Sequence, residues 1–195
     1  MGAYINVGIV FGDECHVVEV FRDFTQYLEK KGVTFTKVKY SLDVDGDNWV
    51  EHMIKENVIK DEWLFGYFTE FELSRCLHLQ HVTFTIHQEE GYFGFLLDLD
   101  LEEVVSNDVF TVQRQLVECL IELYQYLPFE YSFIGVEIEI EVHPRNFEAL
   151  VQKDHGYPVG LIGKQNDMDV YYDQFAIDGM SRQERRKERI PIEKK

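Results

Sequence analysis

Apolar and polar side chains alternate along residues 82–101, and this pattern constrains the fold more than any other in the sequence. Every second residue of VTFTIH is apolar, and so is every second residue of YFGFLLDLDLE, where Asp98, Asp100 and Glu102 take the opposite side. A period of two is that of a β-strand with one buried face. The intervening QEEG predicts a turn, so the two segments should form an antiparallel β-hairpin.

Helices are expected before and after this hairpin. Apolar residues recur at helical spacing from Val17 to Leu28, between two strand-like segments at 4–11 and 33–40, which predicts a β-α-β unit. The same spacing predicts a second helix from Val50 to about Ile59. Two further helices are expected over residues 108–127 and 144–151.

Further strands are expected in the second half of the chain. Val136 to Val142 alternates apolar residues with glutamates, and short strands are expected at 159–162 and 170–172. The segment EWLFGYFTEF at 62–71 fits either a strand or a short helix. These elements predict an α+β fold with one mixed, largely antiparallel sheet and helices packed on one face.

The composition is that of a packed globule. Of the 195 residues 45% are hydrophobic, with 15 Phe and 11 Tyr, far more than a disordered acidic chain carries. The three cysteines are odd in number, far apart and without a CxxC pair, which favours a reducing compartment over a disulfide framework. The sequence shows no signal-peptide pattern and no apolar run of membrane-spanning length, so we expect a soluble cytoplasmic protein.

The charge is acidic and uneven. The net charge is −17, but residues 181–195 hold seven Lys/Arg against three Glu, leaving residues 1–180 with 12 Lys/Arg and 33 Asp/Glu, a net of −21. We expect a single α+β domain over residues 1–180 and a basic C-terminal tail over 181–195, as a frayed helix end or a solvated terminus. So negative a body repels nucleic acid and anionic membrane and favours a cationic partner, although solubility alone is an alternative reason for the acidity.

The stretch DVDGDNWVE at 43–51 is similar to a calcium loop, because Asp43, Asp45 and Asp47 fill its first, third and fifth positions. Asn48 stands where that loop needs a glycine, and Ile54 stands where it needs a bidentate glutamate. The alternative is a turn followed by a helix, with a capping box that begins at Asn48. We expect the turn and keep a metal site at the three aspartates as the alternative.

Catalytic motifs do not stand out. His78, His81 and His87 lie close in the sequence, but six residues of strand would hold His81 and His87 about 20 Å apart, too far for one zinc ion. Patterns such as HExxH and GxSxG are absent. We therefore expect no cofactor and no catalytic residue, with an unrecognised carboxylate/His acid-base site as the enzymatic alternative.

Two acidic rows provide the candidate binding residues. If the strands that carry them are neighbours, about six carboxylates share one patch that suits a basic partner. The alternative is the solvated face of an antiparallel sheet. The aromatic residues of 63–71 fit either the core or an anchor for a partner. The acidic candidates are Asp98, Asp100, Glu102, Glu137, Glu139 and Glu141.

The segments GYFGFLLDLDLEEV at 91–104 and GVEIEIEV at 135–142 occur here in a small, acidic, motif-poor α+β chain. In these features the chain resembles the immunity proteins with which bacteria neutralise polymorphic toxins. The resemblance implies a non-enzymatic binding protein whose protein partner is a toxin domain, often a basic nuclease, blocked by charge and shape. A small enzyme and a calcium-binding module are the alternatives.

Overall fold

The computed structural model describes residues 3–76, 79–80, 82–153 and 156–192. In chain order the elements are β1 (Tyr4–Gly12), α1 (Val17–Lys30), β2 (Thr34–Ser41), β3 (Trp49–Met53), the 3-10 helix η1 (Asp61–Phe65), β4 (Thr69–Ser74), β5 (Val82–Glu89), β6 (Tyr92–Asp100), α2 (Leu101–Ser106), α3 (Val109–Tyr126), β7 (Tyr131–Val136), α4 (Pro144–Lys153), β8 (Val159–Lys164), β9 (Asp167–Tyr172) and β10 (Arg186–Pro191). Within this described part, no helix is both long and apolar enough to cross a membrane.

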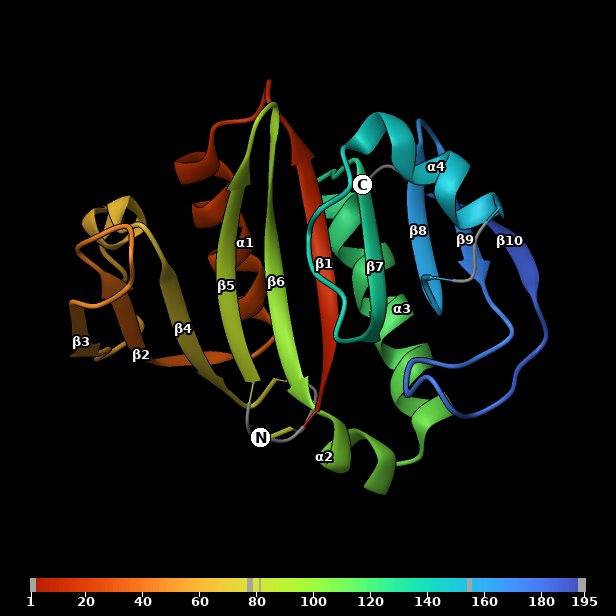
Figure 1. The fold of residues 1–195 in the computed structure, drawn as a ribbon, viewed down its shortest axis with the longest axis horizontal. Helices are drawn as coiled ribbons and strands as arrows, with labels where there is room; N and C mark the ends of the chain where they lie inside the picture. Colours follow the sequence, from red (N-terminus) through yellow and green to blue (C-terminus); the bar gives the residue numbers. More distant parts are fainter. Residues whose placement is uncertain (1–2, 77–78, 81, 154–155, 193–195) are drawn as a thin grey trace.

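The strands form one sheet in the order β10-β9-β8-β7-β1-β6-β5-β4-β2-β3, and each paired neighbour is antiparallel. Figure 1 shows this sheet across the page, from β3 at the left to β10 at the right. The predicted α+β class is confirmed, as are the β5–β6 hairpin and the helices α1, α3 and α4. Residues 62–71 combine both expected forms, since η1 precedes β4.

The early β-α-β order is present, but β1 and β2 are not neighbours. Four antiparallel steps separate them in the sheet, so they run in the same direction with β6, β5 and β4 between them. β1 thereby becomes a central strand, and it is buried from Ile5 to Gly12. Its sequence, YINVGIVFG, is nearly continuous in apolar residues because both of its faces are covered.

The helices α1 and α3 cover one face of the sheet, as Figure 1 shows behind the strands. Their apolar stripes meet the inward residues of β5 and β6. The ring centroids of Phe24, Phe84 and Phe95 lie between 4.9 and 5.3 Å apart, so an aromatic cluster joins α1 to the hairpin. Such pairs stabilise a core beyond the area that they bury.

The opposite face is covered only in part. The helix α4 and residues 137–143 pack over β1, β7 and β8, with the Phe147 ring stacked on Tyr131 at 3.8 Å. Ile140 is buried in the same cluster. Over β3, β2, β4 and β5 no helix of the described residues lies on this side (Figure 1), and that half of the sheet has polar side chains there.

The helix expected from Val50 is wrong, because Trp49–Met53 forms β3 and pairs with β2. The backbone N–H of Leu42 donates to the Asn48 carbonyl at 2.9 Å and closes the hairpin at residue 48. Steps of four between Val50, Ile54 and Val58 therefore had no helical meaning. Pairing with a neighbouring strand overrode the local pattern.

The strand expected at 136–142 is also wrong, since β7 ends at Val136. Glu137 has a φ of 51°, which turns the chain out of the sheet, and the N–H of Ile138 donates to the side chain of Asn6 instead of a strand partner. The exposure still alternates along this segment because Ile140 and its apolar neighbours pack onto the sheet. The alternation of apolar and acidic residues here comes from a segment that packs on the sheet, not from a strand that pairs within it.

The basic C-terminal segment is not a solvated terminus, because Arg186–Pro191 forms β10 and pairs with β9. Asp169, whose side chain is 1% exposed, holds this strand. Arg189 donates to both of its oxygens, at 2.7 and 3.0 Å, and Lys187 lies 2.7 Å from it. These partners lower the pKa of Asp169 to about 2.

Replacing Asp169 with Asn should loosen β10. A folded-state pKa of about 2 against an ordinary 3.8 corresponds to about 2 kcal/mol, which we expect the variant to lose at neutral pH. Since the folded-state pKa is the lower one, this stability is present above the unfolded-state pKa and is lost as the pH falls toward about 2, with about half gone near pH 3. Urea unfolding at both pH values measures the difference.

The matched control is Asp23→Asn on the exposed side of α1, which should change the free energy of unfolding little. Equal stability of the Asp169 variant and the unaltered protein at neutral pH would contradict the stabilisation of β10 by Asp169.

Candidate functional site

The uncovered half of the sheet presents a polar surface that we call the open face. Residues directly opposite each other on neighbouring strands point to the same side. The register therefore aligns Lys37, Glu72, Thr83 and Asp98 in one row and Glu51, Lys39, Glu70 and Thr85 in the next. The open face consists of Lys37, Lys39, Glu51, Glu70, Glu72, Thr83, Thr85, His87 and Asp98.

Ion pairs across the strands neutralise the two lysines of the open face. Lys37 lies 2.8 Å from Glu72 and 3.7 Å from Glu51, and Lys39 lies 2.8 Å from Glu70. The hydrogen bond to Glu72 raises the pKa of Lys37. Since both cations are engaged, the surface toward β5 and β6 is left with an excess of carboxylates.

The Asp98 carboxylate accepts hydrogen bonds from side chains on both strands that neighbour β6. The Asn6 amide donates to it at 2.6 Å and the Thr83 hydroxyl at 3.2 Å. Burial raises the pKa of the Asp98 carboxyl, and these two hydrogen bonds oppose that rise. Asn6 also accepts the N–H of Ile138 at 3.0 Å, so one buried amide joins β6, β1 and the covering segment.

His87 occupies the centre of the acidic groups. Its pKa is lowered by burial, which outweighs the opposite effects of Glu139, Asp98 and Glu89. The imidazole is thus neutral at physiological pH, and its Nε2 lies 3.0 Å from the Thr85 hydroxyl. Within the described ranges its hydrogen-bond partner is this hydroxyl and not a carboxylate.

The structure brings Asp98 and Glu139 together near His87 but does not arrange the six predicted acids in two facing rows. Asp98 and Glu139 both act on His87, and the Glu137 N–H donates to the carbonyl of Tyr4, which is opposite Asp100. The strands β6 and β7 are separated by β1, so the two sets are not on neighbouring strands.

The remaining predicted acids lie apart from this group, each beside neighbours of its own. Asp100 caps α2 by accepting the N–H of Glu103 at 2.9 Å, and Glu102 lies in the first turn of that helix. Burial raises the pKa values of Tyr92 and Tyr157, and the nearby Glu141 carboxylate adds to the rise of both. Asp100 therefore has a structural task, whereas Glu137, Glu139 and Glu141 are exposed.

An aromatic groove of about 580 Å³ adjoins the open face, between the 43–48 turn, β4 and β5. Trp49, Tyr67 and Phe68 line it and are 44%, 63% and 50% exposed. Trp49 stacks on Phe68 at 6.4 Å, and its indole N–H donates to the Gly46 carbonyl at 2.6 Å. Large aromatic side chains exposed together beside a cavity are typical of a binding surface.

The aromatic residues of 63–71 were expected to form either part of the core or an anchor for a partner, and the structure shows some in the core and others on the surface. Trp63 and Phe71 are buried in the core, whereas Tyr67 and Phe68 line the groove. The side chain of Phe65 lies outside the described residues. Trp49 was missed, because a helix was predicted from Val50; the available signal was a Trp directly after the Asp- and Gly-rich turn.

The 43–48 segment forms the expected turn. The Asp43 carboxylate accepts the N–H groups of Asp47 and Asn48 at 2.9 and 2.8 Å, and these bonds lower the pKa of Asp43. Asp43 thereby orients the loop that brings Asp45 and Gly46 to the groove. In the described ranges, no group of three or more His, Cys, Asp or Glu is placed to hold a metal ion. His78 and His81 lie outside those ranges.

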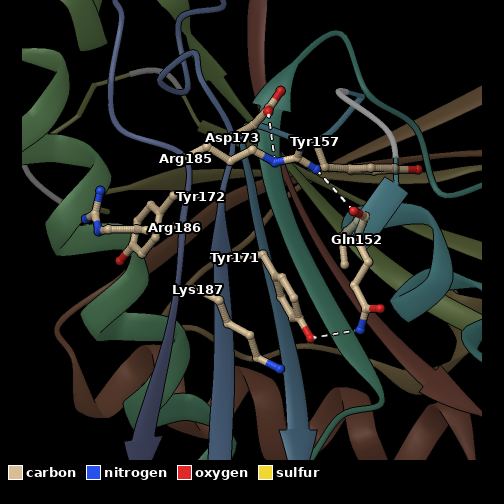
Figure 2. Close-up of a pocket in the computed structure, with 9 residues that line it drawn as sticks. Gln152, Tyr157, Tyr171, Tyr172, Asp173, Arg185, Arg186 and Lys187 are labelled. Carbon is tan, nitrogen blue, oxygen red and sulfur yellow. Dashed lines mark hydrogen bonds and ion pairs between the residues drawn. The ribbon is translucent and has the colours of Figure 1, made fainter.

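A smaller pocket of about 290 Å³ lies where α4 meets β9 and β10 (Figure 2). Figure 2 shows Arg185 reaching across it, where it donates to the Gln152 carbonyl at 3.1 Å and lies 4.0 Å from Asp173. Lys187 is bound to Asp169. Because its cations are engaged within the protein, this pocket joins secondary-structure elements and is a weaker candidate than the aromatic groove.

Comparison with known proteins identifies the class to which this acidic α+β chain belongs, that of immunity proteins. The family model for Immunity protein 64 matches residues 1–183, and the chain belongs to that family. Membership implies a protein partner. No curated protein and no solved structure matches the chain.

Replacing Asn6 with Ala should alter the charge state of the open face. We expect the pKa of Asp98 to rise further, because the lost hydrogen bond favours the ionised carboxyl. The free energy of unfolding should fall by about 1–3 kcal/mol, since the Ile138 N–H loses its acceptor. Carboxyl-carbon NMR titration and urea unfolding measure the two effects.

Thr83→Val is the control, because it removes the other hydrogen bond to Asp98 and leaves the Ile138 contact intact. It should raise the pKa of Asp98 less than Asn6→Ala does. A pKa of Asp98 that stays constant in both variants would contradict the network.

Proposed function

We propose that this member of the Immunity protein 64 family neutralises a bacterial toxin in the cytoplasm by binding its toxin domain and occluding the active site. The observation that carries the proposal is the coincidence of the acidic open face, the exposed aromatic side chains and the 580 Å³ groove on the half of the sheet that no described helix covers on this side. Family membership supports a protein partner for this surface.

The partner surface should be basic. Carboxylates and aromatic rings together recognise Arg and Lys side chains, through ion pairs and through the negative face of the ring. In the protein itself Lys39 lies 5.5 Å over the Trp49 ring, so this ring already accepts a cation. A net charge of −17 speeds association with a basic toxin domain and disfavours nucleic acid and anionic membrane.

The inhibition we propose is stoichiometric and non-enzymatic. The only histidine of the open face is neutral and is bonded to a threonine hydroxyl within the described part of the chain. Blocking an active site requires shape and charge, both of which the open face provides, and it requires no chemical step in the immunity protein itself.

Charge reversal at Glu89 and Glu139 tests the acidic contribution. Both carboxylates are exposed and face His87, so Glu89→Lys with Glu139→Lys should weaken binding at least tenfold and slow association most at low salt. The binding assay uses the inactivated C-terminal domain of the toxin encoded by the neighbouring gene. Growth rescue of cells that produce the active domain is the functional measurement.

The control carries the same charge change on the other side of the sheet, as Glu29→Lys with Glu118→Lys on α1 and α3. It should rescue growth as the unaltered protein does. Rescue lost in the control and kept in the Glu89 and Glu139 variant would place the interface on the helical side.

Removal of the aromatic side chains tests the groove. Trp49→Ala and Phe68→Ala should each weaken binding by tenfold or more, because buried aromatic anchors dominate interface energies at about 2 kcal/mol or more each. Phe110→Ala on α3 is the control, since Phe110 is 45% exposed, similar to Trp49. Isothermal titration with the same toxin domain measures the affinities, and unchanged values for both groove variants would exclude the groove.

A further inference from the structure

The two edge strands of the sheet differ in how their backbones are protected. At β10 the N–H of Ile192 donates to the Asn166 carbonyl at 2.7 Å, which fixes the alternation of inward and outward backbone groups along the strand. Lys187, Arg189 and Pro191 then have backbones that face outward. Pro191 has no N–H and the other two are cations, and natural proteins use both features to prevent strand addition.

The other edge strand, β3, has no such protection. The N–H groups of Leu42 and Ile54 donate to the carbonyls of Asn48 and Thr36, both at 2.9 Å. These two bonds set the alternation, so the N–H and C=O groups of Trp49, Glu51 and Met53 point away from β2. No partner for these groups is present among the described residues, and Figure 1 shows no element beyond β3 at this edge.

The side chains of this edge are also unusual for an unprotected strand. Trp49, Glu51 and Met53 project onto the open-face side, where Trp49 lines the aromatic groove and Met53 is 70% exposed. An edge with exposed apolar side chains and free backbone groups is a template for another strand. Glu51, between Trp49 and Met53 on this side, is an acid, and Asp45 lines the same groove.

We propose that an extended segment of the toxin adds to the outer edge of β3 and continues the sheet by one strand. The inference rests on the proposed function and names how the partner docks. Residues of the added strand that lie opposite Trp49 and Met53 share their face and are apolar, and the residue opposite Glu51 is Lys or Arg. Backbone hydrogen bonds supply affinity, and the aromatic groove and carboxylates supply specificity.

Proline substitution separates backbone pairing from side-chain contact. Glu51→Pro and Met53→Pro each remove an outward N–H that β2 does not use, so the β2–β3 ladder is kept. Glu51→Ala and Met53→Ala are the matched controls, because they remove the same side chains and keep the N–H. With the inactivated toxin domain from the neighbouring gene, we expect each proline variant to bind at least tenfold more weakly than its alanine control.

Amide hydrogen exchange gives a readout that does not depend on how the proline variants fold. In the unaltered protein the Glu51 and Met53 amides should exchange rapidly when free and become protected in the complex, while the Val50 and His52 amides, which face β2, are slow in both states. Protection of the first pair on binding supports strand addition.

The outcomes distinguish the two proposals. Unprotected Glu51 and Met53 amides in a complex that still protects β4 and β5, together with equal binding by proline and alanine variants, would overturn strand addition and leave docking on the open face. Absence of any binding between the unaltered protein and the toxin domain would overturn the proposed function itself.

Discussion

The burial of β1 on both faces is the constraint on which the rest of the molecule depends. A strand with two apolar faces needs a cover on each side of the sheet. The helices α1 and α3 form one cover, and residues 137–153 form the other. The second cover is short: its cluster includes residues of β9, β8, β7, β1 and β6, and toward β3 it stops at β6. Every strand beyond it has to face water on that side, and the open face is the result.

An acidic open face needs internal compensation before it can be stable. Two cross-strand lysines and the Asn6 amide offset part of the repulsion among the carboxylates. The compensation is concentrated on β2, β4 and β1. The exposed acids that remain border the aromatic groove and the 137–141 segment, where a cationic partner would supply the missing charge. Under the proposed function, structural stability and partner recognition depend on different carboxylates of one surface.

The two ends of the sheet are built for opposite purposes. At β10 a buried aspartate clamps a basic strand whose outward backbone is blocked by Pro191. At β3 a short strand keeps its outward backbone free beside Trp49. One edge ends the sheet, and the other is open to a further strand. With one edge blocked, copies of the chain cannot add to each other without end, and the carboxylates beside β3 repel those of a second copy.

The sequence by itself determined the α+β class, the β5–β6 hairpin and the helices α1, α3 and α4, because these follow from periodicity within one segment. It also determined the acidity of the body and the absence of common catalytic motifs. Only the tertiary structure decided that residues 50–53 form a strand, that 137–143 lies on the sheet and that 186–191 extends it, since each depends on contacts with another segment of the chain. The groove was hidden for the same reason: Trp49, Phe68 and Glu89 line one groove only when β3, β2, β4 and β5 are assembled in that order with their faces aligned.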